Sequence, residues 1–124
     1  MKVIDRLPDL KWTELAERQI DKTGGDRLIK MSHVAYQLGD AAVVGLIYET
    51  LTSPPWLWFA LARNTTMRDL IDFRRAQEYI PQGTFTAVET DDPIAVRFAE
   101  FFGFVATLNY FDNDGHTMLV MRKA

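Results

Sequence analysis

The chain has 124 residues, of which 48% are apolar and 12% aromatic, and its net charge is −3. This composition predicts one globular domain over residues 1–124 and excludes a disordered chain. Cysteine is absent, no apolar run is long enough to span a membrane, and the first residues do not resemble a signal peptide, so disulfides are excluded and a cytoplasmic location is expected.

The N-terminal part of the chain predicts a short strand followed by a helix. Residues 2–7 are the expected strand. Asp9 is placed to cap a helix over 11–22, in which small and apolar side chains recur on one stripe. Gly24 follows, and glycine often ends a helix because it readily adopts a positive φ.

The next part of the chain predicts a β-hairpin. Residues 34–38 alternate between apolar and polar or small side chains, and residues 41–49 are almost wholly apolar. Gly39-Asp40 between them is typical of a tight turn. The second strand is apolar on both faces, which predicts a central place in a sheet.

The second half of the chain predicts two helices between strands. One helix covers 66–80, where Thr66 and Asp69 have the spacing of a capping box. The other begins at Asp92 and ends at Gly103. The predicted strands of this half cover 56–62, 84–90, 105–111 and 117–123.

This order of elements predicts an α/β (α+β) fold. A strand, a helix and a strand between residues 56 and 89 favour a parallel pair with a right-handed crossover. The two strands of each hairpin are antiparallel, because a tight turn joins them. We therefore expect a mixed, mostly antiparallel sheet with a central parallel pair and helices on both faces.

Nucleic-acid and metal sites are not expected. Arg68, Arg74 and Arg75 are interleaved with acidic residues, as on a solvated helix face. His33 and His116 lie far apart, so they do not form a ligand pattern. The run at 112–115 lacks the spacing and the closing glutamate of a calcium loop, and it predicts a turn.

The stretch from residue 84 to 104 resembles a motif of the GNAT acyltransferase superfamily. In that motif a strand is followed by Asn-x-x-Ala and then by Gly-Phe, and here Asp92, Ala95 and Gly103-Phe104 stand at those places. The element order is similar over residues 28–123. The resemblance implies that the central parallel strands splay apart and that acetyl-CoA lies between them, with its thiol end near Asp92.

The resemblance also implies an activity, transfer of an acetyl group from acetyl-CoA to a small-molecule or protein amine. Backbone N–H groups near Leu61 would polarise the thioester carbonyl. The diphosphate would lie at Arg63, Asn64, Thr65 and Thr66, where the family loop reads Arg/Gln-x-x-Gly-x-Gly/Ala.

Two departures from the family pattern leave the function open. Thr66 and Arg68 stand where the loop has glycines, and a Cβ hinders close approach to a phosphate, so Thr66 can equally be a plain helix cap. Ala99 stands at the family's tyrosine acid, so no catalytic residue is assigned. Glu49 and Glu89 are more typical of solvated strand ends than of a catalytic base.

A narrower resemblance gives the alternative. The glycine-poor loop and compact pattern are similar to short GNAT-like proteins of short-tailed bacteriophages, including an internal virion protein. This implies a non-catalytic phage or prophage protein that serves virion structure or protein interaction. The tryptophans at 56 and 58 are expected in the core or, where exposed, at a homodimer or partner interface.

Overall fold

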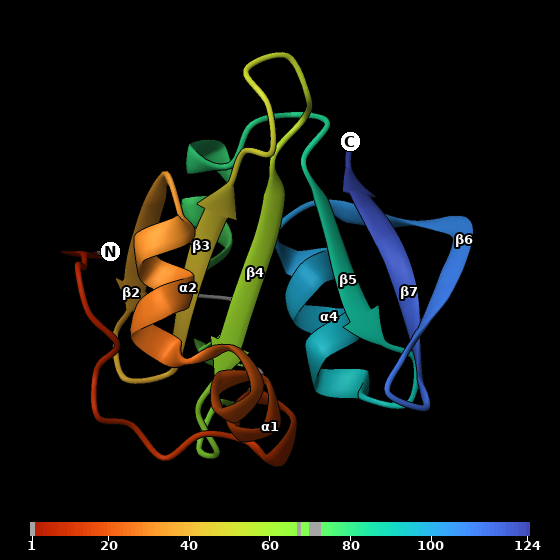
Figure 1. Ribbon diagram of the computed structural model, residues 1–124. Helices are drawn as coiled ribbons and strands as arrows, with labels where there is room; N and C mark the ends of the chain where they lie inside the picture. The colour runs from red at the N-terminus through yellow and green to blue at the C-terminus, as the bar shows by residue number, and fades with distance from the viewer. Residues whose placement is uncertain (1, 67, 70–72) are drawn as a thin grey trace.

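The structure is a computed structural model that describes residues 2–66, 68, 69 and 73–124 (Figure 1). Its elements, in chain order, are β1 (Lys2–Val3), α1 (Glu14–Thr23), α2 (Gly25–Met31), β2 (Val34–Leu38), β3 (Ala42–Ile47), β4 (Trp56–Leu61), the 3-10 helix η1 (Phe73–Tyr79), β5 (Phe85–Glu89), α4 (Pro93–Phe101), β6 (Phe104–Asn113) and β7 (His116–Lys123). No helix of the described part is long and apolar enough to cross a membrane.

The described strands form one sheet in the order β1-β2-β3-β4-β5-β7-β6. The β4–β5 pair is parallel, and the other pairings of the sheet are antiparallel. In Figure 1, α1 and α2 lie in front of the sheet and α4 lies behind it. The expected mixed sheet with helices on both faces is therefore confirmed.

Each face of the sheet has its own core cluster, and β3 contributes to both. Val44 packs with Phe98 and Phe102 on the α4 face, whereas Val43 packs with Trp58 and the buried side chains of α2 on the other face. This double burial explains why the sequence of β3 is apolar throughout.

The N-terminal helix differs from the prediction in its start. Thr13 caps α1, because its Oγ1 accepts a hydrogen bond from the backbone N–H of Ala16 at 3.2 Å. Asp9 lies upstream in irregular backbone, so the prediction of a helix from residue 11 was wrong. Residues 11–13 are extended instead. The sequence analysis also missed α2, which follows α1 directly after Gly24, a residue with φ of 77°.

The predicted helix over 66–80 is confirmed in part. Thr66 and Asp69 form the expected capping box: the N–H of Thr66 donates to Oδ2 of Asp69 at 3.0 Å, and the N–H of Asp69 donates to Oγ1 of Thr66 at 3.3 Å. Residues 68 and 69 are helical, and 73–79 form η1. Residues 67 and 70–72 lie outside the described part of the chain.

The helix α4 matches its predicted ends. Oδ1 of Asp92 accepts a hydrogen bond from the N–H of Ala95 at 3.1 Å, and Pro93 follows at the first helical position. Gly103 has φ of 87° just beyond the helix. Phe98 is fully buried against the ring of Phe59, at 4.7 Å between centroids, and this packing fixes α4 behind β4.

Candidate active site

The two parallel strands splay apart soon after they meet. They pair only at Trp56 with Phe85 and at Leu57 with Thr86. At this narrow end, Oγ1 of Thr86 donates a hydrogen bond to the carbonyl of Leu57 at 2.8 Å. Beyond it, β4 remains paired with β3, and β5 with β7. The splay implied by the family resemblance is thus present.

The backbone of β4 directs polar groups into this splay. Ala62, next to β4, donates its N–H to the carbonyl of Ala41 on the β3 side. The carbonyls of Leu57 and Leu61 point away from β3 and accept hydrogen bonds from Thr86 and Thr13, respectively. In a strand, the N–H and C=O of one residue point to the same side, and those of the next residue point to the opposite side. The N–H groups of Phe59 and Leu61 therefore also face the splay.

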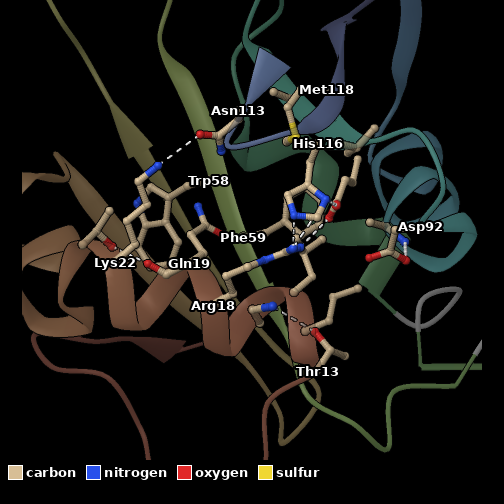
Figure 2. A pocket seen from close by; sticks show the side chains of 18 of the residues that line it. Thr13, Arg18, Gln19, Lys22, Trp58, Phe59, Asp92, Asn113, His116 and Met118 are labelled. Carbon is tan, nitrogen blue, oxygen red and sulfur yellow. Dashed lines mark hydrogen bonds and ion pairs between the residues drawn. The ribbon is translucent and has the colours of Figure 1, made fainter. Parts of the chain in front are cut away.

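A cavity of about 430 Å³ opens at the wide end of the splay (Figure 2). It lies between α1, the carboxyl ends of β4 and β5, the start of α4 and the turn between β6 and β7. Its walls are mainly apolar and aromatic, and include Trp58, Phe59, Leu61, Val88, Phe111 and Met118. The volume and lining are typical of a small-molecule site.

The lining of the cavity includes a charged cluster formed by Arg18, Glu89 and His116 (Figure 2). Glu89 ends β5, and its side chain is only 8% exposed. Its Oε1 lies 2.5 Å from Nδ1 of His116, and its Oε2 accepts a hydrogen bond from Nη2 of Arg18 at 2.9 Å. Nη1 of Arg18 also contacts Nε2 of His116. The interpretation of Glu89 as a solvated strand end was therefore wrong, whereas Glu49 is exposed as expected.

A second ionic contact joins α1 to the β6–β7 turn. Nζ of Lys22 lies 2.5 Å from Oδ2 of Asp114 and 3.2 Å from Oδ1 of Asn113. The hydrogen bond and the positive charge of Lys22 lower the pKa of the Asp114 carboxyl from its usual value of 3.8. Together with the charged cluster, this contact holds α1 beside the turn at the cavity (Figure 2).

No sequence signal pointed to these contacts. The partners of Arg18 lie 71 and 98 residues away in the chain, and Lys22 and Asp114 are 92 residues apart. The sequence patterns of a helix or strand depend only on residues close together in the chain. Pairs this far apart can therefore be recognised only once the strand order is known. Among the described residues, no group of three or more potential metal ligands comes together.

Two of the residues predicted to bind acetyl-CoA line the cavity. Leu61 lies on its β4 wall, and Asp92 lies at the start of α4, where its carboxylate caps the helix. The edge of β4 beside Leu61 already has a partner. Its carbonyl accepts a hydrogen bond from the N–H of Thr13 at 2.9 Å, and the N–H of Arg63 donates to the carbonyl of Lys11 at 2.6 Å. Residues 11–13 thus run along β4 at the wide end of the splay.

The other predicted residues belong to a turn with its own partners. Nε of Arg63 donates to the carbonyl of Trp12 at 2.7 Å, and its Nη2 lies 3.5 Å from Glu17. Oγ1 of Thr65 donates to the carbonyl of Ala41 at 2.6 Å. Asn64 is exposed, and Thr66 is bonded to Asp69 in the capping box.

The fit to acetyl-CoA therefore differs between its two ends. At the thioester end, the inward N–H groups of β4 and the enclosed cavity suit a polarised carbonyl beside an acceptor. At the diphosphate end, the Asp69 carboxylate already takes the N–H of Thr66, and a negative charge at this place is unfavourable for another anion. These residues do not fit a diphosphate as they stand.

Solved acetyltransferases share the fold. A spermidine N-acetyltransferase SpeG chimera that includes Vibrio cholerae sequence has a TM-score of 0.54 at 16% identity, over 89% of this chain and 75% of that one. An IAA acetyltransferase from Bacillus cereus has a TM-score of 0.54 at 15% identity, over 89% and 85%. An acetyltransferase of the GNAT family from Streptococcus pneumoniae has a TM-score of 0.54 at 15% identity, over 86% and 72%.

These similarities show that the chain has the fold of GNAT acetyltransferases. No protein-family model matches the chain, and neither does any curated protein sequence. The connection with bacteriophage and virion proteins gains no support from the structural neighbours, and it stays a prediction.

Proposed function

We propose that the protein is an N-acyltransferase that takes an acyl group from acetyl-CoA and transfers it to an amine held in the cavity. The observation that carries this proposal is the splay of β4 and β5, which opens into a cavity with a buried carboxylate in its wall. The shared fold with solved acetyltransferases supports it as a fold-level analogy.

The residues of the chain have separate tasks in this reaction. The acyl donor supplies an activated carbonyl and a thiol leaving group. The N–H groups of Phe59 and Leu61 face the splay and would stabilise negative charge on that carbonyl oxygen. The aromatic walls and α1 would shield part of the bound acceptor from water, which would strengthen its polar contacts with the cavity.

The charges of the cavity favour an acceptor with one amino group. Spermidine is named for one structural neighbour. Here two cations, Arg18 and Lys22, line the cavity, and each is paired with a carboxylate, Glu89 and Asp114 respectively. One further carboxylate, Asp92, lines the cavity, so the lining carries one negative charge in excess. One excess negative charge matches one ammonium group better than the several of a polyamine. We propose a monoamine with an apolar body, or a protein amine presented on a short side chain.

Thermal unfolding in the presence of acetyl-CoA tests the proposal. A ligand at one hundred times its Kd stabilises a protein by about 2.7 kcal/mol, which corresponds to several degrees for a domain of this size. We expect this shift in the wild type and its loss in Ala87→Phe, because Ala87 lines the cavity and a phenyl ring would fill it. The exposed Ala106→Phe on β6 is the matched control.

A second candidate function is a non-catalytic role in protein interaction. The Thr66–Asp69 capping box and the pairing of residues 11–13 with β4 favour it, because both occupy the expected path of the cofactor. The edge strand β6 would be the contact surface, since Val105, Leu108 and Tyr110 are exposed on it. No shift with millimolar acetyl-CoA would favour this function, whether the partner is a second copy, a host protein or a virion component.

A further inference from the structure

We infer that His116 is the base that takes the proton from the acceptor amine and that Glu89 holds its imidazole in the required orientation. This inference rests on the proposed function and adds the proton acceptor, which no sequence motif assigned. It follows from which atoms of the charged cluster can donate hydrogen bonds and which can accept them.

The neighbours of His116 favour one tautomer. Ionised Glu89 can only accept hydrogen bonds, and its Oε1 lies 2.5 Å from Nδ1. The guanidinium of Arg18 can only donate, and its Nη1 lies much closer to Nε2 than to Nδ1, from which it is 3.5 Å away. Both contacts are satisfied when the imidazole is neutral and carries its proton on Nδ1. Nε2 then has a lone pair, which is the state that a base needs before it accepts a proton.

The contact made by Arg18 indicates what His116 binds. A protonated primary amine is also a cation that only donates hydrogen bonds. It can therefore replace Nη1 of Arg18 at Nε2 of His116. Arg18 has room to withdraw, because its side chain is 43% exposed on α1, and it can keep its bond to Glu89 through Nη2.

The walls of the cavity place the rest of the acceptor. The cluster forms one part of the wall, and apolar and aromatic side chains of β4, β6 and β7 form much of the rest. A small amine with a phenyl or aliphatic body would lie along Phe59 and Met118 with its nitrogen at His116. Besides His116, the ionisable groups that line the cavity are Arg18 and Lys22 of α1, Glu89 of β5, Asp92 at α4 and Asp114 in the turn.

The proton balance of the transfer assigns one step to His116. Nε2 takes one proton from the ammonium group, and the nitrogen forms a bond to the acyl carbon while the carbon–sulfur bond breaks. The electron pair goes to sulfur, which receives the second proton from the nitrogen. An amide and a thiol leave, and His116 returns its extra proton to water. The carboxylate of Glu89 stabilises the imidazolium during this step.

Two substitutions test the base and its positioning residue by kinetics. We would assay thiol release from acetyl-CoA with benzylamine and phenethylamine. His116→Gln is expected to lower kcat/KM by roughly 10²–10⁴-fold, the usual contribution of a general base. Glu89→Gln is expected to lower it less. The matched controls His33→Gln and Glu49→Gln change exposed residues away from the cavity and should leave it unchanged.

Nitrogen-15 NMR gives a readout that does not depend on turnover. The chain has two histidines, so two imidazole patterns are expected, and His33→Gln assigns them. His116 should show the Nδ1–H tautomer in the wild type and a mixture in Glu89→Gln. Benzylamine should shift Nε2 of His116 and leave His33 unchanged.

The outcomes separate the inference from the proposed function. If acetyl-CoA binds, any of three results would overturn the inference. These are an Nε2–H tautomer of His116, no response of His116 to benzylamine, and a kcat/KM of His116→Gln within about 3-fold of wild type. If acetyl-CoA neither binds nor is consumed, the proposed function is wrong and the inference falls with it.

Discussion

The cavity and the 63–66 turn, with its capping box to Asp69, adjoin the same end of β4 but satisfy their polar groups in different ways. In the cavity, Glu89 binds Arg18 from 71 residues away, and the two meet on different elements. In the turn, Thr66 and Asp69 bind one another across three residues. The contact between Glu89 and Arg18 forms only when the sheet and α1 have folded together, whereas the contact between Thr66 and Asp69 needs only one turn of backbone.

This difference teaches where a ligand can be bound. A polar group bonded within its own turn has little to offer a ligand, since binding would have to break the local bonds first. The carboxylate of Glu89 is costly to bury in a mainly apolar cavity, and its partners, Arg18 on α1 and His116 at the start of β7, are 43% and 38% exposed and can exchange. The contrast favours the cavity as the functional region.

The largest predicted effect is on the core that supports the cavity. Phe98 is fully buried between the rings of Phe59 and Phe102. Phe98→Ala should lower the free energy of unfolding by about 3–5 kcal/mol, because it removes apolar contacts and leaves a void. Urea unfolding measures it.

The control for this change lies on the same helix. Ile94 is 44% exposed, so Ile94→Ala should cost about 0.5 kcal/mol or less. An equal loss in both variants would mean that α4 is not held by the face assigned to it, and the support of the cavity would need another explanation.

A smaller effect is expected at the charged cluster. Glu89→Gln keeps the size of the side chain but removes the charge that Arg18 and His116 share. We expect a loss of about 1.5–3 kcal/mol in urea unfolding, the range for hydrogen bonds to a charged group. Glu49→Gln, in the exposed segment that follows β3, should change the free energy of unfolding by about 0.5 kcal/mol at most. No difference between the two would show that the cluster contributes nothing to stability.

The sequence predicted the parts of the fold that depend on local signals. Asp92, Pro93 and Gly103 lie within or beside one short helix, and their positions followed from capping preferences alone. The capping box of Thr66 and Asp69 was recognised for the same reason. Apolar runs and their order predicted a mixed sheet with one parallel pair, because each strand has its own periodicity.

The parts that were missed depend on distant contacts. The burial of Glu89 is caused by β7 beside it and by α1 above it, and neither is near in the sequence. The extended path of residues 11–13 is decided by pairing with the end of β4, which overrides the helical pattern of that stretch. The candidate site therefore could not be predicted beyond Leu61 and Asp92.

The closed turn can be tested through the affinity for the acyl donor. Asp69 places a negative charge where the diphosphate is expected. Asp69→Asn should strengthen binding of acetyl-CoA by about 0.3–1 kcal/mol, the usual size of a charge effect at a helix start. Calorimetry at low ionic strength measures it, and Asp5→Asn in the exposed N-terminal segment is the control. Weaker binding in Asp69→Asn would show that this carboxylate supports the donor site, and the contrast between the two regions would be lost.

The smallest effect concerns the outer ionic contact of the cavity. Lys22 lowers the pKa of Asp114 below 3.8, so the ionised carboxylate stabilises the folded state above that pH. The contribution is lost as the pH falls from the unfolded-state pKa through the lowered pKa, because in that range the unfolded state binds a proton that the folded state does not, and a neutral carboxyl no longer attracts Lys22. Urea midpoints of wild type and Asp114→Asn should therefore differ slightly at about pH 5, converge in more acidic solution, and converge also in roughly 1 M salt. Lys22→Gln should behave like Asp114→Asn. If the midpoints already coincide at pH 5 in low salt, the pair does not hold α1 to the turn, and the charged cluster alone closes that side of the cavity.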